Sequence, residues 1–334
     1  MTIRVEYLVA KMFPYQRVIG FLKDWTLPVA IVVGIGSYLA FHYAGFSPEV
    51  HYAAELGIAV LQPILIFLML FLAFCHVSVR DMKIKRWHWW LLLIQMTVSI
   101  ILAFIALPLT GGWKIVAEAA FCCVVCPTAT ASAIITSKLD GSIADCSTYV
   151  IISNLLASIL IPLFVPLLNP VEGLTFMSMF LRLAVKFFPL LIGPLLLAWL
   201  IRYTMPRLNN WLLKQKDWAF YLWLIALPIA IIIATKALFH SNITLWTFIG
   251  VAVVSLGCCL VQFHIGHKIG VHYGDRVTTG QALGQKNTGF IIWVAYTFMA
   301  PVNAVAGGLY CIWHNNMNAW QLYRHKKAKT AHLK

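Results

Sequence analysis

The sequence has very little charge for its length. Of its 334 residues, 11% are Asp, Glu, Lys or Arg, whereas a soluble domain carries about a quarter. Acidic residues are the scarcest, with 11 Asp and Glu against 25 Lys and Arg. So few charged side chains cannot cover a water-facing surface of this size, so a soluble enzyme is excluded.

Apolar residues take the place of the missing charge. They make up 61% of the chain, with 13 Trp and 20 Phe among them. A helix needs roughly 20 apolar residues to cross about 30 Å of hydrocarbon. The sequence therefore predicts an all-α membrane protein with ten transmembrane helices. The expected helices lie at 26–44, 54–76, 87–108, 115–137, 143–168, 176–201, 217–235, 244–267, 277–299 and 301–323.

The basic residues fall mainly on one side of these runs. Twenty of the 25 lie at the termini or in alternate loops on the side of the termini, and two lie in loops on the other side. Lys and Arg gather in cytoplasmic loops, which predicts a multi-pass protein of the plasma (cytoplasmic or inner) membrane with both termini cytoplasmic. The net charge of +14 is then a topology signal, and no nucleic-acid partner is expected.

The order of the runs divides the chain into two halves. Residues 25–168 and 175–324 each hold five expected helices. Because five is odd, the second unit runs opposite to the first, which is the inverted repeat of many secondary transporters. Residues 1–24 are expected to form a cytoplasmic amphipathic segment at the lipid interface. Residues 325–334 are expected to be a basic cytoplasmic tail.

Corresponding helices of the two halves, the fourth and the ninth, carry polar breaks. The fourth reads Cys-Pro-Thr-Ala-Thr-Ala-Ser over 126–132, and the ninth reads Gly-Gln-Lys-Asn-Thr-Gly over 284–289. Such breaks survive in lipid only against protein or water, and they present free N–H and C=O groups. The alternative is a kink satisfied by neighbouring hydroxyls. We expect Pro127, Gly284 and Gly289 to break the helices, and the substrate to contact Thr128, Thr130, Ser132, Asn287 and Thr288.

These motifs resemble those of the bile acid:sodium symporter family. The resemblance covers residues 126–157, residues 280–290 and Gln95 in the third helix, and the topology agrees over nearly the whole chain. It implies a divergent, bacterial-type member in which helices 4 and 9 cross at unwound centres, with a panel domain facing a core domain. The implied function is secondary transport of a bile acid-like or smaller organic anion, a carboxylate or sulfonate, by alternating access.

The family's two sodium sites are altered in this chain. Ser132 is kept at the first site, but Ala133, Cys146, Val150 and Ala282 occupy positions where the family has Asn, Ser, Thr and Glu. Sodium needs several oxygen ligands, which these side chains do not offer. Sodium coupling is therefore doubtful, and no other cofactor is expected. Transport is expected to be proton-linked or uncoupled.

Lys286 stands where the family's second sodium site has a Gln. At 1.5 Å per residue it lies about 15 Å inside the membrane, where a charge by default marks a functional site. We expect its ammonium to replace the cation beside Gln95 and the freed carbonyls. It then serves as a counter-charge for an anionic substrate or as the proton-coupling group. The alternative is a Lys that snorkels to the interface.

Three other functions remain open. A Cys beside a Pro in the fourth helix is also typical of arsenite carriers, which leaves metalloid efflux as an alternative. A metal-dependent membrane enzyme that uses His264, His267 and His272 is a second alternative. A receptor that binds an organic anion without transporting it is the third. No catalytic or metal-binding residue is predicted, and the sequence leaves the oligomeric state open.

Overall fold

The computed structural model describes residues 26–78, 82–215 and 217–332, and within them the chain is helical with no β-sheet. The expected N-terminal segment 1–24 lies outside these residues. The helices are α3 (Thr26–Tyr43), α4 (Pro48–Cys75), α5 (Arg86–Ala106), α6 (Gly111–Val125), α7 (Ala131–Lys138), α8 (Ile143–Leu168), α9 (Phe176–Thr204), α10 (Pro206–Lys214), α11 (Trp218–Phe239), α12 (Leu245–Tyr273), α13 (Arg276–Gly284), α14 (Thr288–Phe298) and α15 (Ala304–His332), with a 3-10 turn η2 (Pro301–Asn303) before α15.

Six of the described helices are long and apolar enough to cross a membrane. They are α4, α5, α8, α9, α11 and α12. Large apolar side chains on their outer faces are exposed, such as Ile64, Leu196 and Val253, as expected where lipid rather than water is the solvent. The chain is therefore a multi-pass membrane protein.

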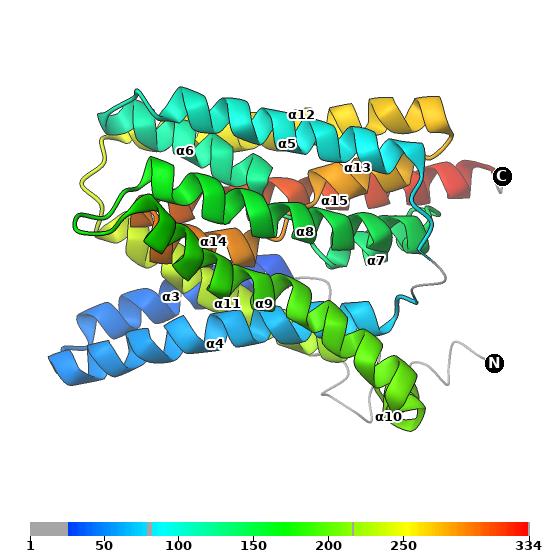
Figure 1. Cartoon of the computed structure of the whole chain (residues 1–334), viewed down its shortest axis with the longest axis horizontal. Helices are drawn as coiled ribbons and strands as arrows, with labels where there is room; N and C mark the ends of the chain where they lie inside the picture. Colours follow the sequence, from blue (N-terminus) through cyan, green and yellow to red (C-terminus); the bar gives the residue numbers. More distant parts are fainter. Residues whose placement is uncertain (1–25, 79–81, 216, 333–334) are drawn as a thin grey trace.

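The helices form two groups (Figure 1). The panel group consists of α3, α4, α9, α10 and α11, in which α3 packs on α11 and α4 packs on α9. The core group consists of α5 to α8 and α12 to α15. The groups meet where α8 contacts α9, where α4 and α11 contact α14, and where α11 contacts α15. Helix α14 thus lies between the panel group and the rest of the core group.

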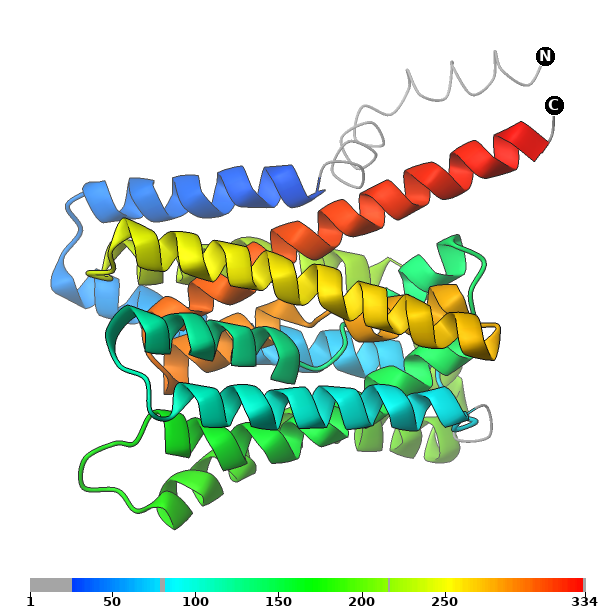
Figure 2. The same cartoon turned by 90° about the horizontal axis from the view of Figure 1, so that it is seen from above.

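The two ends of the bundle differ in charge. The end that carries the α7–α8 turn, the α12–α13 turn and the C-terminal end of α15 (Figures 1 and 2) is here called the basic end, and the opposite one the far end. At the basic end Lys85 contacts Asp145 at 2.5 Å and Asp275 at 3.6 Å. The hydrogen bond that Lys85 donates to the Asp145 carboxylate raises the pKa of Lys85. Beside it, Asp140 contacts Lys329 at 2.6 Å.

The structure adds two details about the ends of elements. Within the basic segment 325–334, α15 continues to His332. Ion pairs from Lys329 and His325 to Asp140 hold this last part of the helix against the α7–α8 turn. The sequence reading also missed α10, a short helix between α9 and α11. Its Asn209 and Leu212 are buried.

Candidate functional site

Both polar interruptions separate two helices in the structure. The first break, residues 126–130, separates α6 from α7, and the second break, residues 285–287, separates α13 from α14. The two breaks lie against each other, with an antiparallel bridge between Thr128 and Lys286. Helix α7 begins at Ala131, directly after the first break.

Backbone hydrogen bonds join the two breaks. The Ala129 N–H donates to the Gln285 carbonyl at 3.0 Å, and the Asn287 N–H donates to the Pro127 carbonyl at 2.8 Å. Unpaired backbone groups are costly inside a membrane. Each break therefore provides hydrogen-bond partners for backbone groups of the other. Two breaks that face each other leave fewer unpaired backbone groups than a single break would.

Thr128 fixes this crossing rather than facing a cavity. Its side chain is fully buried and its hydroxyl donates to the Ala282 carbonyl at 2.6 Å. Its N–H donates to the Ser153 hydroxyl at 3.1 Å. Because Pro127 has no N–H to continue the helix, the chain turns here, and Thr128 ties it to α13 and α8.

Lys286 is buried at the end of α6. Its side chain is 1% exposed, and its Nζ donates to the Val124 carbonyl at 3.4 Å. The Gln95 amide donates to the next two carbonyls, Val125 at 3.4 Å and Cys126 at 3.1 Å. An ammonium and an amide thus meet three consecutive carbonyls at the negative end of a helix dipole, where a cation is stabilised.

No carboxylate among the described residues lies within ion-pair distance of Lys286. Its ionisable neighbours are the thiols of Cys123, Cys126 and Cys258. Among the described residues, the hydrogen bond of the Lys286 ammonium is to the Val124 carbonyl. A charged group inside a membrane is by default a candidate functional site, and an ammonium without a carboxylate beside it can attract an anion or give up its proton.

The remaining predicted substrate contacts differ in accessibility. Ser132 is buried with its hydroxyl 3.3 Å from the Cys146 sulfur, and Thr288 is 6% exposed. Thr130 and Asn287 are half-buried. The Asn287 side chain also accepts the N–H of a residue in the first turn of α14 at 3.3 Å, as a helix cap. Thr130 and Asn287 are thus the most accessible of the predicted contacts.

Gln62 is a residue that the sequence reading missed. It lies inside α4, is fully buried, and donates to the Gly289 carbonyl at 3.4 Å. Its side chain carries a polar contact from the panel group to the second break. The signal available in the sequence was a lone amide next to Pro63 within a long apolar run, where a polar group usually has a specific partner.

Two Gln–Tyr pairs flank the breaks, one from each half of the chain. The Tyr149 hydroxyl donates to the Gln95 side chain at 3.0 Å. The Gln262 amide donates to the Tyr310 hydroxyl at 3.1 Å, and that hydroxyl donates to the Gly284 carbonyl at 2.8 Å. Each pair thereby bonds the last carbonyls of a broken helix, α6 in one half and α13 in the other.

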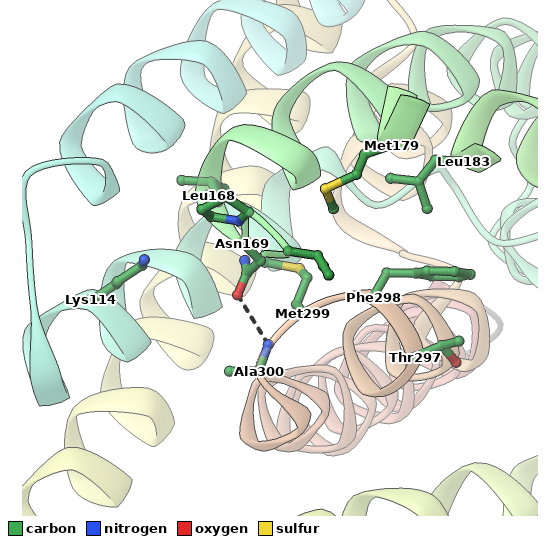
Figure 3. Close-up of a pocket in the computed structure, with 11 residues that line it drawn as sticks. Lys114, Leu168, Asn169, Met179, Leu183, Thr297, Phe298, Met299 and Ala300 are labelled. Atoms are coloured by element: carbon green, nitrogen blue, oxygen red, sulfur yellow. Dashed lines mark hydrogen bonds between the residues drawn. The ribbon is translucent and has the colours of Figure 1, made fainter. Parts of the chain in front are cut away.

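The far end contains a cavity of about 620 Å³ between α6, the α8–α9 turn and the end of α14. Figure 3 shows Lys114 directed toward Asn169, whose side chain accepts the Ala300 N–H at 3.2 Å. Beside the cavity the buried carboxylate of Glu118 accepts from Asn303 at 2.5 Å and from Asn169 at 3.2 Å. These bonds tie α6, α8 and η2 together and hold the far end of the core group.

Two of the alternative functions depend on histidine or cysteine side chains. Within the described ranges no group of three His, Cys, Asp or Glu side chains is placed to hold a metal ion. His264 and His272 are exposed and His267 packs on Phe263. All eight cysteines are free, and the Cys126 thiol donates to the backbone at 3.1 Å.

No protein-family model matches this chain, and no curated protein matches it either. Its function is therefore inferred from its own residues and their geometry.

Proposed function

We propose that this protein is a secondary active transporter of a small organic anion that works by alternating access. One observation carries the proposal: Lys286 is buried where the two breaks lie against each other, and its ammonium donates to the Val124 carbonyl. Secondary transporters bind substrate where broken helices meet near the membrane midplane. A cationic centre there favours a carboxylate or a sulfonate, from a compact acid to a bile acid.

The contacts within the core group support ten spans in two inverted five-helix repeats. Such a repeat would exchange α5 with α12, α6 with α13, α7 with α14, and α8 with α15. The contacts of α5 with α6 and of α7 with α8 then become α12 with α13 and α14 with α15, and all four occur. The contact of α8 with α13 becomes α15 with α6, which also occurs. These helix pairs of one half thus have counterparts in the other.

A helix contact within the panel group also has its counterpart when the two halves are exchanged. Helix α3 would exchange with α9 and α4 with α11, so that the α3–α11 contact becomes the α9–α4 contact. Both are extensive packing surfaces. The panel group and the core group are then the two bodies that rock against each other, and α14, with Gln62 against it, lies at their boundary.

We further propose that the chain is a divergent member of the bile acid:sodium symporter family in which Lys286 has replaced the second sodium ion. The first cation position supports this view, because the Cys146 sulfur lies against Ser132. A thiol is a poor ligand for a hard cation. We infer transport that is proton-linked or uncoupled rather than sodium-coupled, with Thr130 and Asn287 contacting the substrate. From the positive-inside rule we infer that the basic end and both termini are cytoplasmic.

Uptake by purified protein in proteoliposomes tests the proposal. The probes are radiolabelled taurocholate, benzoate and ethanesulfonate, each offered with an imposed sodium gradient, an imposed proton gradient or neither. We expect uptake of at least one probe that does not change when sodium is replaced by choline. Specific binding of a probe without uptake would indicate a receptor instead, and uptake that requires sodium would contradict the account of the two cation positions.

A further inference from the structure

A stripe of polar side chains runs along the half of α15 that leads to the basic end. Tyr310, His314, Asn318, Gln321 and His325 follow one another at intervals of three or four residues, which places them on one face of the helix. His314 and Asn318 are each 4% exposed. A polar stripe buried along a membrane helix faces protein or a water-filled space rather than lipid.

The stripe faces α13. The Gln281 amide donates to Asn318 at 3.1 Å and to Gln321 at 2.9 Å. Nearer the break, Tyr310 bonds the Gly284 carbonyl, so the two helices run antiparallel. Gln285 lies one turn beyond Gln281, and on the other helix one turn from Asn318 leads to His314. The space between the two helices along these residues is here called the α13–α15 seam.

The seam contains an unusual number of buried polar atoms without a partner in the protein. On α13 this is an acceptor, the Oε1 atom of Gln281, and at the start of the second break it is the Oε1 atom of Gln285. On α15 they are two amide donors, Nδ2 of Asn318 and Nε2 of Gln321, together with Nδ1 of His314. Buried polar atoms in native proteins are almost always hydrogen-bonded, and those that lack a protein partner commonly bond an ordered water.

We propose that the α13–α15 seam binds a chain of ordered waters that leads from the basic end toward Lys286. Gln281 bonds both Asn318 and Gln321, yet each of these three amides keeps one polar atom without a protein partner. A water molecule can accept from the free donors of Asn318 and Gln321 and donate to the free acceptor of Gln281. The ligand of this site is therefore water.

The chain has a natural mouth and a natural end. Its mouth lies where His325 and Lys329 contact Asp140. Its inner end is Tyr310, which Gln262 joins to the Cys123 carbonyl at 3.3 Å. That carbonyl is next along α6 to the Val124 carbonyl, which Lys286 bonds.

The waters give Lys286 a route for proton exchange with the basic end. The ionisable groups around Lys286 along this route are the thiols of Cys123, Cys126 and Cys258. The phenol of Tyr310 lies beside the same three thiols. This role in proton access rests on the proposed transport function, whereas the presence of the waters does not.

Radiolytic labelling of the full-length protein in detergent tests for the waters. Millisecond X-ray pulses convert bound water to hydroxyl radicals, which oxidise the side chains that they touch, and mass spectrometry measures the rate at each residue. His88 is the matched control, because it is fully buried and both of its ring nitrogens have protein partners. We expect His314 to be oxidised at least fivefold faster than His88. Equal rates would overturn the proposal.

Filling the seam tests the assignment of that signal. In the double variant Gln281→Leu and Asn318→Leu, oxidation of His314 is expected to fall to the rate of His88. Gln321→Leu at the half-buried mouth is the milder variant if the double variant does not fold, and a fall of at least twofold is expected. Unchanged labelling of His314 in a folded variant would contradict the water chain.

The transport readout separates the two proposals. In the same double variant we expect probe uptake driven by a proton gradient to fall at least fivefold, with probe exchange at equal pH within twofold of the parent. Fast labelling of His314 in a protein that transports no probe would leave the water chain standing and remove the proposed function. Proton-driven uptake that the double variant leaves unchanged would remove the proton route.

Discussion

Two helix pairs reach the crossing from opposite ends, and their contact surfaces differ in chemistry. Between α6 and α8, on the far side, Phe121 packs edge-on against Phe164 with ring centroids 6.2 Å apart, and Leu160 and Ile161 belong to the same apolar cluster. Between α13 and α15, on the basic side, the contacts are amides and an imidazole. In the proposed inverted repeat these two surfaces correspond. The difference predicts that, through these two surfaces, water reaches Lys286 from the basic end alone.

Reversing the chemistry of the apolar surface is expected to have the largest effect on stability. Phe164→Asn removes a buried aromatic ring and leaves an amide without a partner, which should cost about 3–5 kcal/mol. Gln321→Leu on the α13–α15 seam is the matched change, and we expect it to cost less than about 1 kcal/mol because half-buried surface becomes apolar. Thermal unfolding in detergent measures both. Equal losses would mean that the two surfaces do not differ in the way described.

The far end and the basic end are held by different electrostatics. Glu118 is buried and bonded by two amides, so Glu118→Gln should destabilise the protein by about 1.5–3 kcal/mol, the range for hydrogen bonds to a charged group. This loss should be nearly the same at low and high salt, because a buried charge is poorly screened. Thermal midpoints of the parent and the variant at two salt concentrations measure it, and a loss that disappears at high salt would count against a buried site.

The two tyrosines next to the breaks offer a closer comparison. Tyr310 bonds both Gly284 and Gln262, whereas Tyr149 bonds Gln95 alone. Removing each hydroxyl by substitution with Phe should therefore cost more at Tyr310, about 1–2 kcal/mol, than at Tyr149, at about 1 kcal/mol or less. The unfolding midpoints of the two variants provide the measurement. The reverse order would show that the Tyr310 hydroxyl does not stabilise the end of α13.

The smallest expected effect lies at the mouth of the seam. The hydrogen bond from Lys329 lowers the pKa of Asp140. A carboxyl group with a lowered pKa in the folded state stabilises the protein above its unfolded pKa and loses that contribution as the pH falls through the folded pKa. Asp140→Asn should therefore lower the thermal midpoint slightly at pH 7, with the difference shrinking as the pH falls through the lowered pKa of the carboxyl group. Because the group is exposed and screened, the shift is expected to be small.

The sequence was most informative where a residue's meaning depends on its neighbours in the chain. Runs of apolar residues, the side on which Lys and Arg gather, and a Pro or Gly within a run all act locally. Those features located the two breaks and Lys286 within one of them, and the family resemblance added Gln95. The structure brings both side chains to adjacent carbonyls at the end of α6.

The partners of those residues could not be read in this way. Gln62 bonds the Gly289 carbonyl, just after the second break, and lies 227 residues earlier in the chain. The role of Thr128 depends on Ala282 and Ser153, which lie on two other helices. The polar stripe of α15 was visible as a spacing, yet its meaning depends on α13 lying opposite. The function of a helix face can be inferred only when the helix opposite it is known.

The central claim is that the ammonium of Lys286 does the work of a bound cation. The most direct measurement is probe uptake into proteoliposomes by the parent, by Lys286→Met and by Lys286→Gln, each with and without sodium. We predict sodium-independent uptake by the parent and a loss of more than tenfold in Lys286→Met, since an apolar side chain can neither attract an anion nor exchange a proton. Lys286→Gln, which restores an oxygen ligand, should regain at most a sodium-dependent fraction. Full activity of Lys286→Met with unchanged pH dependence would contradict the account.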